Sequence, residues 1–262
     1  MKFSMMTYSL MRQGKFTPED CVRVAAELKM EGIDWVSTYG RDPRELRKMS
    51  ADAGLTVAAH TFFLRENTGI PPLEAAKRSL DDACELGAPV VMIVPLPFAG
   101  VSDPAENRKR WCERLNAVAP LAAERGILMS VENFPGENSP FVTADDFYEA
   151  KKAVPSLKLT FDDGNASTGE DPVESLKRCF TDVVHVHFKD WDVCDEPREN
   201  WRRMSDGRYY SAALIGEGVV NNRAVLDTLE ELGYDGFINI EYESAKYPGD
   251  VAVRKALEYL KR

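Results

Sequence analysis

Eight short apolar runs, separated by segments with helical patterns, constrain the fold of this chain more than any other feature. The runs cover Lys2–Leu10, Ile33–Thr38, Leu55–His60, Pro89–Val94, Ile127–Asn133, Leu157–Asp162, Val183–Phe188 and Phe237–Glu241. Most lack simple alternation, which is typical of parallel strands covered on both faces. Eight strands alternating with helices predict an α/β fold, a (β/α)₈ TIM barrel that residues 1–262 form as a single domain. An open doubly wound sheet is the alternative, but no Gly-x-Gly-x-x-Gly follows the first strand.

Short motifs mark where the helices between these strands begin and end. Four expected starts pair an N-cap oxygen with a proline at the first helical position, at Thr17-Pro18, Asp42-Pro43, Asp103-Pro104 and Asp171-Pro172. Five glycines are expected just past helix ends in a left-handed conformation, namely Gly32, Gly54, Gly87, Gly126 and Gly233.

One connection is longer than the others. Strand starts are 22 to 38 residues apart until the last interval, which is 54 residues from Val183 to Phe237. The surplus lies mostly within Trp191–Leu214, a polar segment that carries four arginines. It follows the seventh strand, at the end of the barrel where such enzymes keep their active sites. We therefore expect an extended loop that acts as a lid, with a surface loop that has no function as the alternative.

Charge and cysteine usage exclude several classes of function. The net charge of −10 argues against a nucleic-acid partner, which would need a basic face. No stretch approaches the roughly 18 apolar residues of a membrane span, and the N-terminus reads as a strand rather than a signal peptide. We expect a cytoplasmic protein without a membrane partner. The five cysteines form no metal knuckle, and there are three histidines, so a metal site must depend on carboxylates.

Four consecutive strands carry a pair of polar residues near their ends. The pairs are Ser130 and Glu132, Thr160 and Asp162, His185 and His187, and Asn239 and Glu241. Side chains two apart on a strand point the same way, so each pair is expected to face the barrel interior. The sequence therefore predicts two polar layers at the carboxyl ends of the strands. The outer layer contains Glu132, Asp162, His187 and Glu241.

The outer layer has the composition of a metal site. Three carboxylates inside a barrel would strongly oppose one another's ionisation unless a cation lay between them. An oxygen-rich set with one imidazole favours Mn²⁺, with Mg²⁺, Co²⁺ and Zn²⁺ as alternatives. His185 and Asn239 in the inner layer are expected to orient these ligands from behind. For any single strand, a structural polar residue is the competing interpretation.

Several strings along the chain match a known family. They are Val131-Glu132-Asn133, Phe161-Asp162-Asp163-Gly164-Asn165, His185-Val186-His187-Phe188-Lys189-Asp190, Gly216-Glu217-Gly218 and the closing Gly233–Glu241. With these strings the chain resembles the xylose-isomerase-like barrels, the sugar phosphate isomerase/epimerase family. The resemblance implies one divalent metal held by Glu132, Asp162, His187 and Glu241. It also implies that Glu132 and Glu241 exchange protons with the substrate on opposite faces.

The same resemblance marks two departures and one exclusion. Asn165 stands where several relatives carry a substrate-binding histidine, and the second strand ends Val36-Ser37-Thr38 where many relatives have an acidic residue. Apurinic endonucleases share the fold but need a histidine-rich trinuclear zinc site, which three histidines cannot supply.

Four residues are candidates to bind the substrate: His60, Asn165, Lys189 and Trp191. His60 ends the third strand. Lys189 lies two residues after His187, so its side chain is expected on the same face of the strand. A core histidine and a solvated rim lysine are the alternatives. Trp191, with Phe62, Phe98 and Phe134, lies just past a strand end, where it would either line a sugar pocket or pack in a loop.

These features predict a metal-dependent sugar isomerase or epimerase acting on a ketose, an aldose or a related polyhydroxy carbonyl compound. A glutamate would remove the proton between the carbonyl and a neighbouring hydroxyl, and reprotonation would invert or isomerise the centre. The alternative is a lyase with the same site, such as an inosose dehydratase or an enzyme that cleaves 3-keto-glycosides. A non-catalytic sugar-binding barrel is a third hypothesis. Association into a homo-oligomer through the outer helices is a further expectation.

Overall fold

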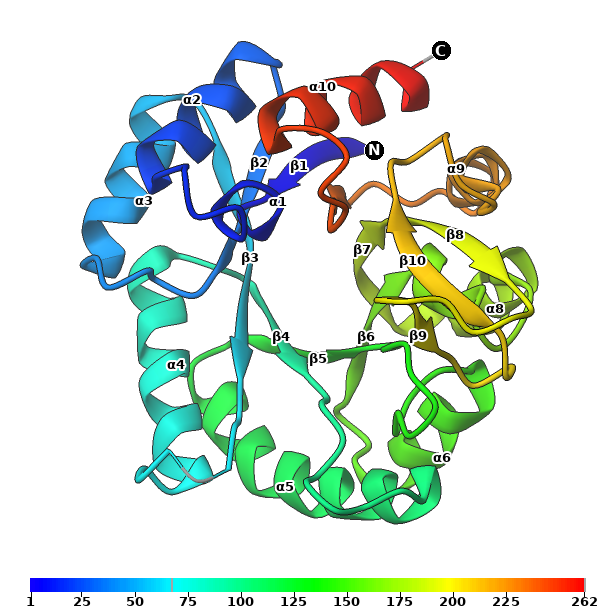
Figure 1. Ribbon diagram of the computed structural model, residues 1–262. Coiled ribbons are helices and arrows are strands. Elements are labelled where there is room, and N and C mark those ends of the chain that lie inside the picture. Colours follow the sequence, from blue (N-terminus) through cyan, green and yellow to red (C-terminus); the bar gives the residue numbers. More distant parts are fainter. Residues whose placement is uncertain (67, 262) are drawn as a thin grey trace.

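The computed structural model describes residues 1–66 and 68–261 and confirms the barrel. Eight parallel strands close in the order β1-β11-β7-β6-β5-β4-β3-β2, with helices around them (Figure 1). The barrel strands are β1 (Lys2–Met6), β2 (Gly32–Val36), β3 (Thr56–Phe63), β4 (Val90–Val94), β5 (Leu128–Glu132), β6 (Lys158–Asp162), β7 (Val183–Phe188) and β11 (Phe237–Ile240). None of the helices in the described part of the chain is long and apolar enough to cross a membrane.

The helices lie between the strands as predicted, with short extra turns. They are α1 (Tyr8–Met11), α2 (Pro18–Glu27), α3 (Pro43–Asp52), α4 (Pro72–Leu86), α5 (Pro104–Glu124), α6 (Ala144–Ala153), α7 (Asp163–Ala166), α8 (Pro172–Cys179), the 3₁₀ turn η1 (Phe180–Asp182), α9 (Asn222–Glu231) and α10 (Gly249–Leu260). The side chains of Thr17, Asp42, Asp103 and Asp171 each accept a first-turn backbone N–H, which confirms the four predicted starts.

Two local expectations are wrong. The first run does not continue as a strand to Leu10, because Thr7 has helical dihedrals and bonds through its hydroxyl to Asp34 O and Val36 N on β2. Gly32 does not end a helix. It begins β2, while Lys29 takes the left-handed conformation with φ 53°. A Cβ at Gly32 would lie 2.5 Å from the Phe237 ring, so close strand packing explains the glycine.

The two faces of the strands separate apolar and polar side chains as expected. Val131, Phe161, Val186 and Ile240 are fully buried in the main hydrophobic core. The polar residues beside them face the barrel interior. Asp34 on β2 and His185 on β7 are 3.2 Å apart although β1 and β11 separate their strands, so this contact crosses the inside of the barrel.

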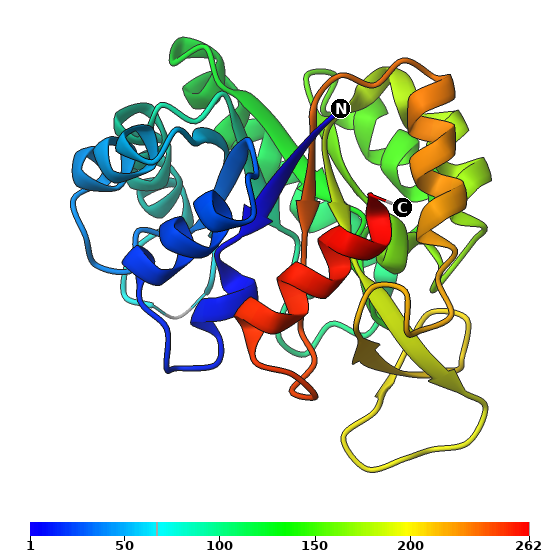
Figure 2. The same ribbon diagram turned by 90° about the horizontal axis from the view of Figure 1, so that it is seen from above.

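The long segment after β7 is an ordered antiparallel sheet rather than an irregular loop. Its strands are β8 (Asp190–Cys194), β9 (Arg202–Arg203) and β10 (Tyr209–Ala213). Trp191, Met204, Tyr210 and Val220 form a small core of its own. Figure 2 shows this sheet projecting from the barrel beyond the helices. We refer to residues 190–213 as the hairpin sheet.

Asp190 ties the hairpin sheet to the barrel. Its carboxylate accepts four backbone N–H groups, from Trp191, Gly216, Gly218 and Val220, at 2.8 to 3.0 Å. These bonds join the first residues of β8 to the segment that leads into α9.

We expect Asp190→Ala to lower the free energy of unfolding by roughly 2–4 kcal/mol, because it leaves several buried donors without an acceptor. Urea denaturation followed by circular dichroism measures this change. Asp192→Ala, two residues further on and exposed, is the matched control and should stay within about 0.5 kcal/mol of wild type. Equal stability of the two variants would contradict the role of Asp190.

Candidate metal centre

The four predicted ligands converge at the carboxyl ends of the strands. Glu132 and Asp162 end β5 and β6, His187 lies in β7, and Glu241 follows β11. Each offers one ligand atom, and these atoms all lie within 4.8 Å of one another. His187 Nδ1 is 2.7 Å from Glu132 Oε1 and 3.4 Å from Glu241 Oε2. All four side chains are buried. The polar residues spaced two apart on four strands therefore predicted that these four side chains lie together, and in the structure they do.

The electrostatics of the cluster indicate a missing positive charge. Burial raises the pKa of Glu132, and burial together with the charges of Glu132 and Glu241 raises the pKa of Asp162 well above its usual value. Asp162 Oδ2 and Glu241 Oε2 are buried without a hydrogen-bond partner. Buried oxygens of this kind ordinarily have a partner. A divalent cation would satisfy them and offset the repulsion, so the donor set fits a hard or borderline metal.

Lys189 supplies one positive charge at the edge of this cluster. Its buried Nζ lies 2.8 Å from Glu241 Oε1 and 3.1 Å from Glu243 Oε1. Burial opposes ionisation of Glu241, but the positive charges of Lys189 and His187 outweigh it and hold the pKa of Glu241 below its usual range. Lys189 is thus a buried ion-pair partner of Glu241 and not a solvated rim lysine.

Glu243 connects the cluster to the hairpin sheet. Arg202 Nη2 on β9 is 3.5 Å from Glu243 Oε2, and the Arg202 guanidinium lies over the Trp191 ring, 5.3 Å from its centre. The sequence analysis missed Glu243, although its spacing of two from Glu241 was a usable signal. The predicted lid segment therefore touches the candidate site through Arg202.

The other predicted substrate residues occupy different positions. Asn165 is fully buried in α7; its backbone N–H donates to Asp162 Oδ1 at 2.6 Å, and its amide atoms have no partner. His60 Nδ1 lies 2.8 Å from the Trp35 carbonyl oxygen. Trp191 is buried in the core of the hairpin sheet with Lys189 Nζ 5.2 Å from its ring centre. Of the four, Lys189 and Asn165 directly contact proposed ligands.

The residues behind the ligands meet at an aspartate that the sequence analysis missed. His185 and Asn239, predicted to orient the ligands, both bond to Asp34 Oδ2, at 3.2 and 3.1 Å. Asp34 is fully buried in β2 between Ile33 and Trp35. A lone acidic residue within an apolar strand was the signal for it.

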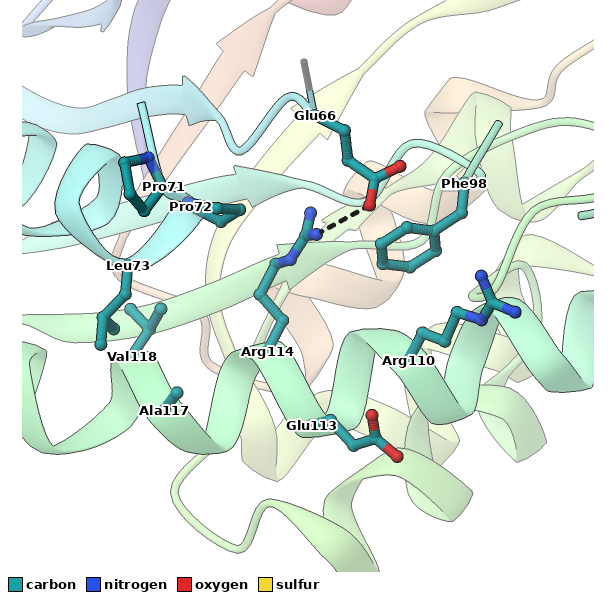
Figure 3. Close-up of a pocket in the computed structure, with 10 residues that line it drawn as sticks. All are labelled: Glu66, Pro71, Pro72, Leu73, Phe98, Arg110, Glu113, Arg114, Ala117 and Val118. Atoms are coloured by element: carbon teal, nitrogen blue, oxygen red, sulfur yellow. Dashed lines mark hydrogen bonds and ion pairs between the residues drawn. The ribbon is translucent and has the colours of Figure 1, made fainter. Parts of the chain in front are cut away.

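A separate hollow on the outer surface does not contain the site. It measures about 480 Å³ and lies between the start of α4 and α5, where Leu73, Phe98 and Arg114 are among its lining residues (Figure 3). None of the four proposed ligands lines it. Phe98 packs against Trp111 on α5, with ring centres 5.7 Å apart.

Comparison with known proteins identifies the family. The sequence profile of the xylose isomerase-like TIM barrel matches residues 22–262. The chain belongs to this family. An inosose dehydratase of Geobacillus thermodenitrificans is 26% identical over 94% of this chain and 87% of its own length.

Two solved structures show the same fold. D-psicose 3-epimerase from Clostridium cellulolyticum H10 superposes with a TM-score of 0.76 at 14% identity, covering 100% of this chain and 98% of its own. The IolI protein, solved with a zinc atom, has a TM-score of 0.79 at 17% identity over 98% and 96% of the two chains. Both solved structures therefore share the barrel fold of this chain.

Proposed function

We propose that the protein is a divalent-metal-dependent lyase that removes water from a keto-polyol such as an inosose. The observation that carries this proposal is the unequal environment of the two glutamates. Glu241 is ion-paired with Lys189 Nζ at 2.8 Å, whereas the described residues bring no lysine or arginine against Glu132, which leaves Glu132 free to act as a base. The name of the Geobacillus relative supports the same outcome. This reverses the order that the sequence suggested, in which isomerisation or epimerisation came first.

Glu132, Asp162, His187 and Glu241 would hold one metal ion per chain. When bound, the ion would polarise the carbonyl group of the substrate and so acidify the adjacent C–H bond. Three carboxylates and one imidazole favour Mn²⁺; the zinc atom in IolI keeps Zn²⁺ as an alternative, with Mg²⁺ and Co²⁺ also suited to the donors.

Two residues of this chain would carry out the proton transfers and stabilise the charge that forms on the substrate. Glu132 removes the proton from the carbon beside the carbonyl group, and Lys189 stabilises the negative charge that develops on the substrate. The protonated Glu132 then returns the proton to the departing hydroxyl group, so that the C–O bond breaks, a C=C bond forms and water leaves. One working carboxylate is sufficient for this sequence. Asn165 and Lys189, in contact with the ligands, are the leading substrate contacts, while His60 and Trp191 remain candidates.

An isomerase or epimerase is the second candidate, and one observation favours it. Glu132 and Glu241 both lie beside His187 Nδ1 but come from β5 and β11, which are separated by β6 and β7. They would therefore approach a substrate from different sides, as inversion with two exchanging glutamates requires.

The two candidates differ in the mass of the product. Metal-loaded protein incubated with an inosose should yield a product that has lost one water molecule, which mass spectrometry detects directly. A panel of ketoses tests the second candidate, because isomerisation and epimerisation leave the mass unchanged. Conversion of a ketose at unchanged mass, without dehydration of the inosose, would favour the isomerase or epimerase.

The hairpin sheet is expected to close over the substrate through Arg202. Arg202→Ala should raise KM about three- to tenfold, a modest effect because the ion pair to Glu243 is partly exposed, and should leave metal content unchanged. Steady-state kinetics with elemental analysis measures both. Arg198→Ala, on the same sheet segment, removes a guanidinium that stacks on Trp201 and is the matched control. Equal KM values for the two variants would contradict a role of the hairpin sheet in substrate binding.

A further inference from the structure

Asp34 occupies the centre of the polar barrel interior, directly behind the candidate metal centre. Its Oδ2 accepts from His185 Nε2 at 3.2 Å and from Asn239 Nδ2 at 3.1 Å, and its Oδ1 accepts from Thr61 Oγ1 at 3.3 Å. The donors come from β7, β11 and β3. The Asn239 orientation is fixed independently, because its Oδ1 accepts from Ser4 Oγ at 2.9 Å.

The ring of His187 lies between Asp34 and the carboxylates. Its Nδ1 faces Glu132 Oε1 at 2.7 Å, while its Nε2 is 3.4 Å from Asp34 Oδ2 and makes no well-aligned hydrogen bond. His185 packs edge-on against it, with ring centres 5.1 Å apart. A histidine that binds a metal through one nitrogen usually donates its other N–H to a carboxylate or carbonyl, which fixes tautomer and orientation.

We infer that Asp34 is the positioning residue of His187: its carboxylate, 3.4 Å from Nε2, holds the imidazole ring so that Nδ1 points at Glu132 and the metal position. His185 and Asn239 act on His187 through Asp34, because both hold the carboxylate in place. This inference rests on the metal site of the proposed function, but the orientation of the His187 ring is a property of the metal-free chain as well.

The hydrogen bonds around Asp34 argue against a second metal at this point. Asp34, His185 and His187 also offer three donor atoms within 4.8 Å of one another. The two oxygens of Asp34, however, already accept three hydrogen bonds, and the Asn239 group that faces it is an NH₂, which repels a cation. A second ion would also have to compete with the carboxylates for His187. The cluster is therefore built to accept N–H groups.

Two measurements test the role of Asp34. Isothermal titration with Mn²⁺ should show affinity reduced about 10–100-fold in Asp34→Asn, which keeps the shape and removes the charge. Ser130→Ala is the matched control: Ser130 lies in the same interior layer but bonds to Thr160 and the Val91 carbonyl, so affinity should stay within about twofold of wild type. Crystal structures of the metal-free proteins should show the His187 ring in Asp34→Asn turned away from its wild-type orientation, while Ser130→Ala should keep that orientation.

The outcomes separate this inference from the proposed function. Wild-type affinity and an unchanged His187 orientation in Asp34→Asn would overturn the role of Asp34, as would a wild-type crystal structure in which His187 Nε2 points away from Asp34, which needs no variant to fold. Two Mn²⁺ ions per wild-type chain, one of them lost in Asp34→Asn, would replace the positioning role with a second metal site. A wild type that binds no metal, but whose His187 ring is displaced by Asp34→Asn, would refute the metal site and retain the positioning role.

Discussion

Glu132→Gln should reduce turnover by about 10²–10⁴-fold, the usual contribution of a positioned general base, while the protein still binds metal. Glutamine keeps one oxygen in the position of the carboxylate but cannot remove a proton. Glu132 lacks the ion pair to a lysine that Glu241 makes, so it is the better placed of the two glutamates to remove a proton. Steady-state kinetics on an inosose, with elemental analysis of the same preparation, separates loss of the base from loss of the metal.

The companion variant Glu241→Gln distinguishes the two chemical candidates. Because Lys189 keeps Glu241 ionised, the lyase account expects Glu241→Gln to weaken metal binding more than it lowers turnover at saturating metal. The isomerase account expects equal losses of turnover from both variants. In D₂O, that account also expects solvent deuterium at the reacting carbon of the product. Equal losses together with deuterated product of unchanged mass would contradict the lyase.

Asp162→Asn should bind less than about a tenth of a metal ion per chain after chelation and reloading, where the wild type binds one. The substitution removes the negative charge of Asp162, whose buried Oδ2 has no hydrogen-bond partner in the protein. Glu243→Gln is the control, since it changes a neighbouring carboxylate outside the four-residue set. Full metal occupancy of Asp162→Asn would contradict the ligand assignment.

The same variant has a second, pH-dependent effect on the metal-free protein. The folded-state pKa of Asp162 lies well above its unfolded value, so the native chain binds more protons than the unfolded chain between these two values. The stability of the metal-free wild type should therefore fall as pH rises through this window, and the stability of metal-free Asp162→Asn should fall less. Urea midpoints measured across the acidic to neutral range provide the comparison.

The barrel and its four candidate ligands could be predicted because both depend on local patterns. Residues two apart on a strand share a face whatever the tertiary structure, so Glu132, Asp162, His187 and Glu241 could be placed from four short runs. Asp34 stood out as an acidic residue in an apolar strand, but its contact with His185 could not be predicted, because that contact crosses the barrel and depends on strand order and closure.

The segment after β7 shows a different limit of sequence patterns. Its surplus length and its position over the candidate site were readable, but its sheet was not. The strand β9 has two residues, and the core of the sheet combines Trp191 with Met204, Tyr210 and Val220 from separate stretches. Packing of this kind leaves little periodicity in the sequence, which explains why the segment resembled a loop.

The central claim, that one divalent cation held by the four-residue cluster is required for dehydration, is tested most directly by titrating chelator-stripped protein with Mn²⁺. At each addition, product formation from an inosose is measured as the loss of one water molecule from the mass of the substrate. The account predicts no product before Mn²⁺ is added. The rate of product formation should then rise linearly with added Mn²⁺ and reach a plateau when one ion is bound per chain. Full dehydration activity in the stripped protein, or a plateau without any bound ion, would contradict it.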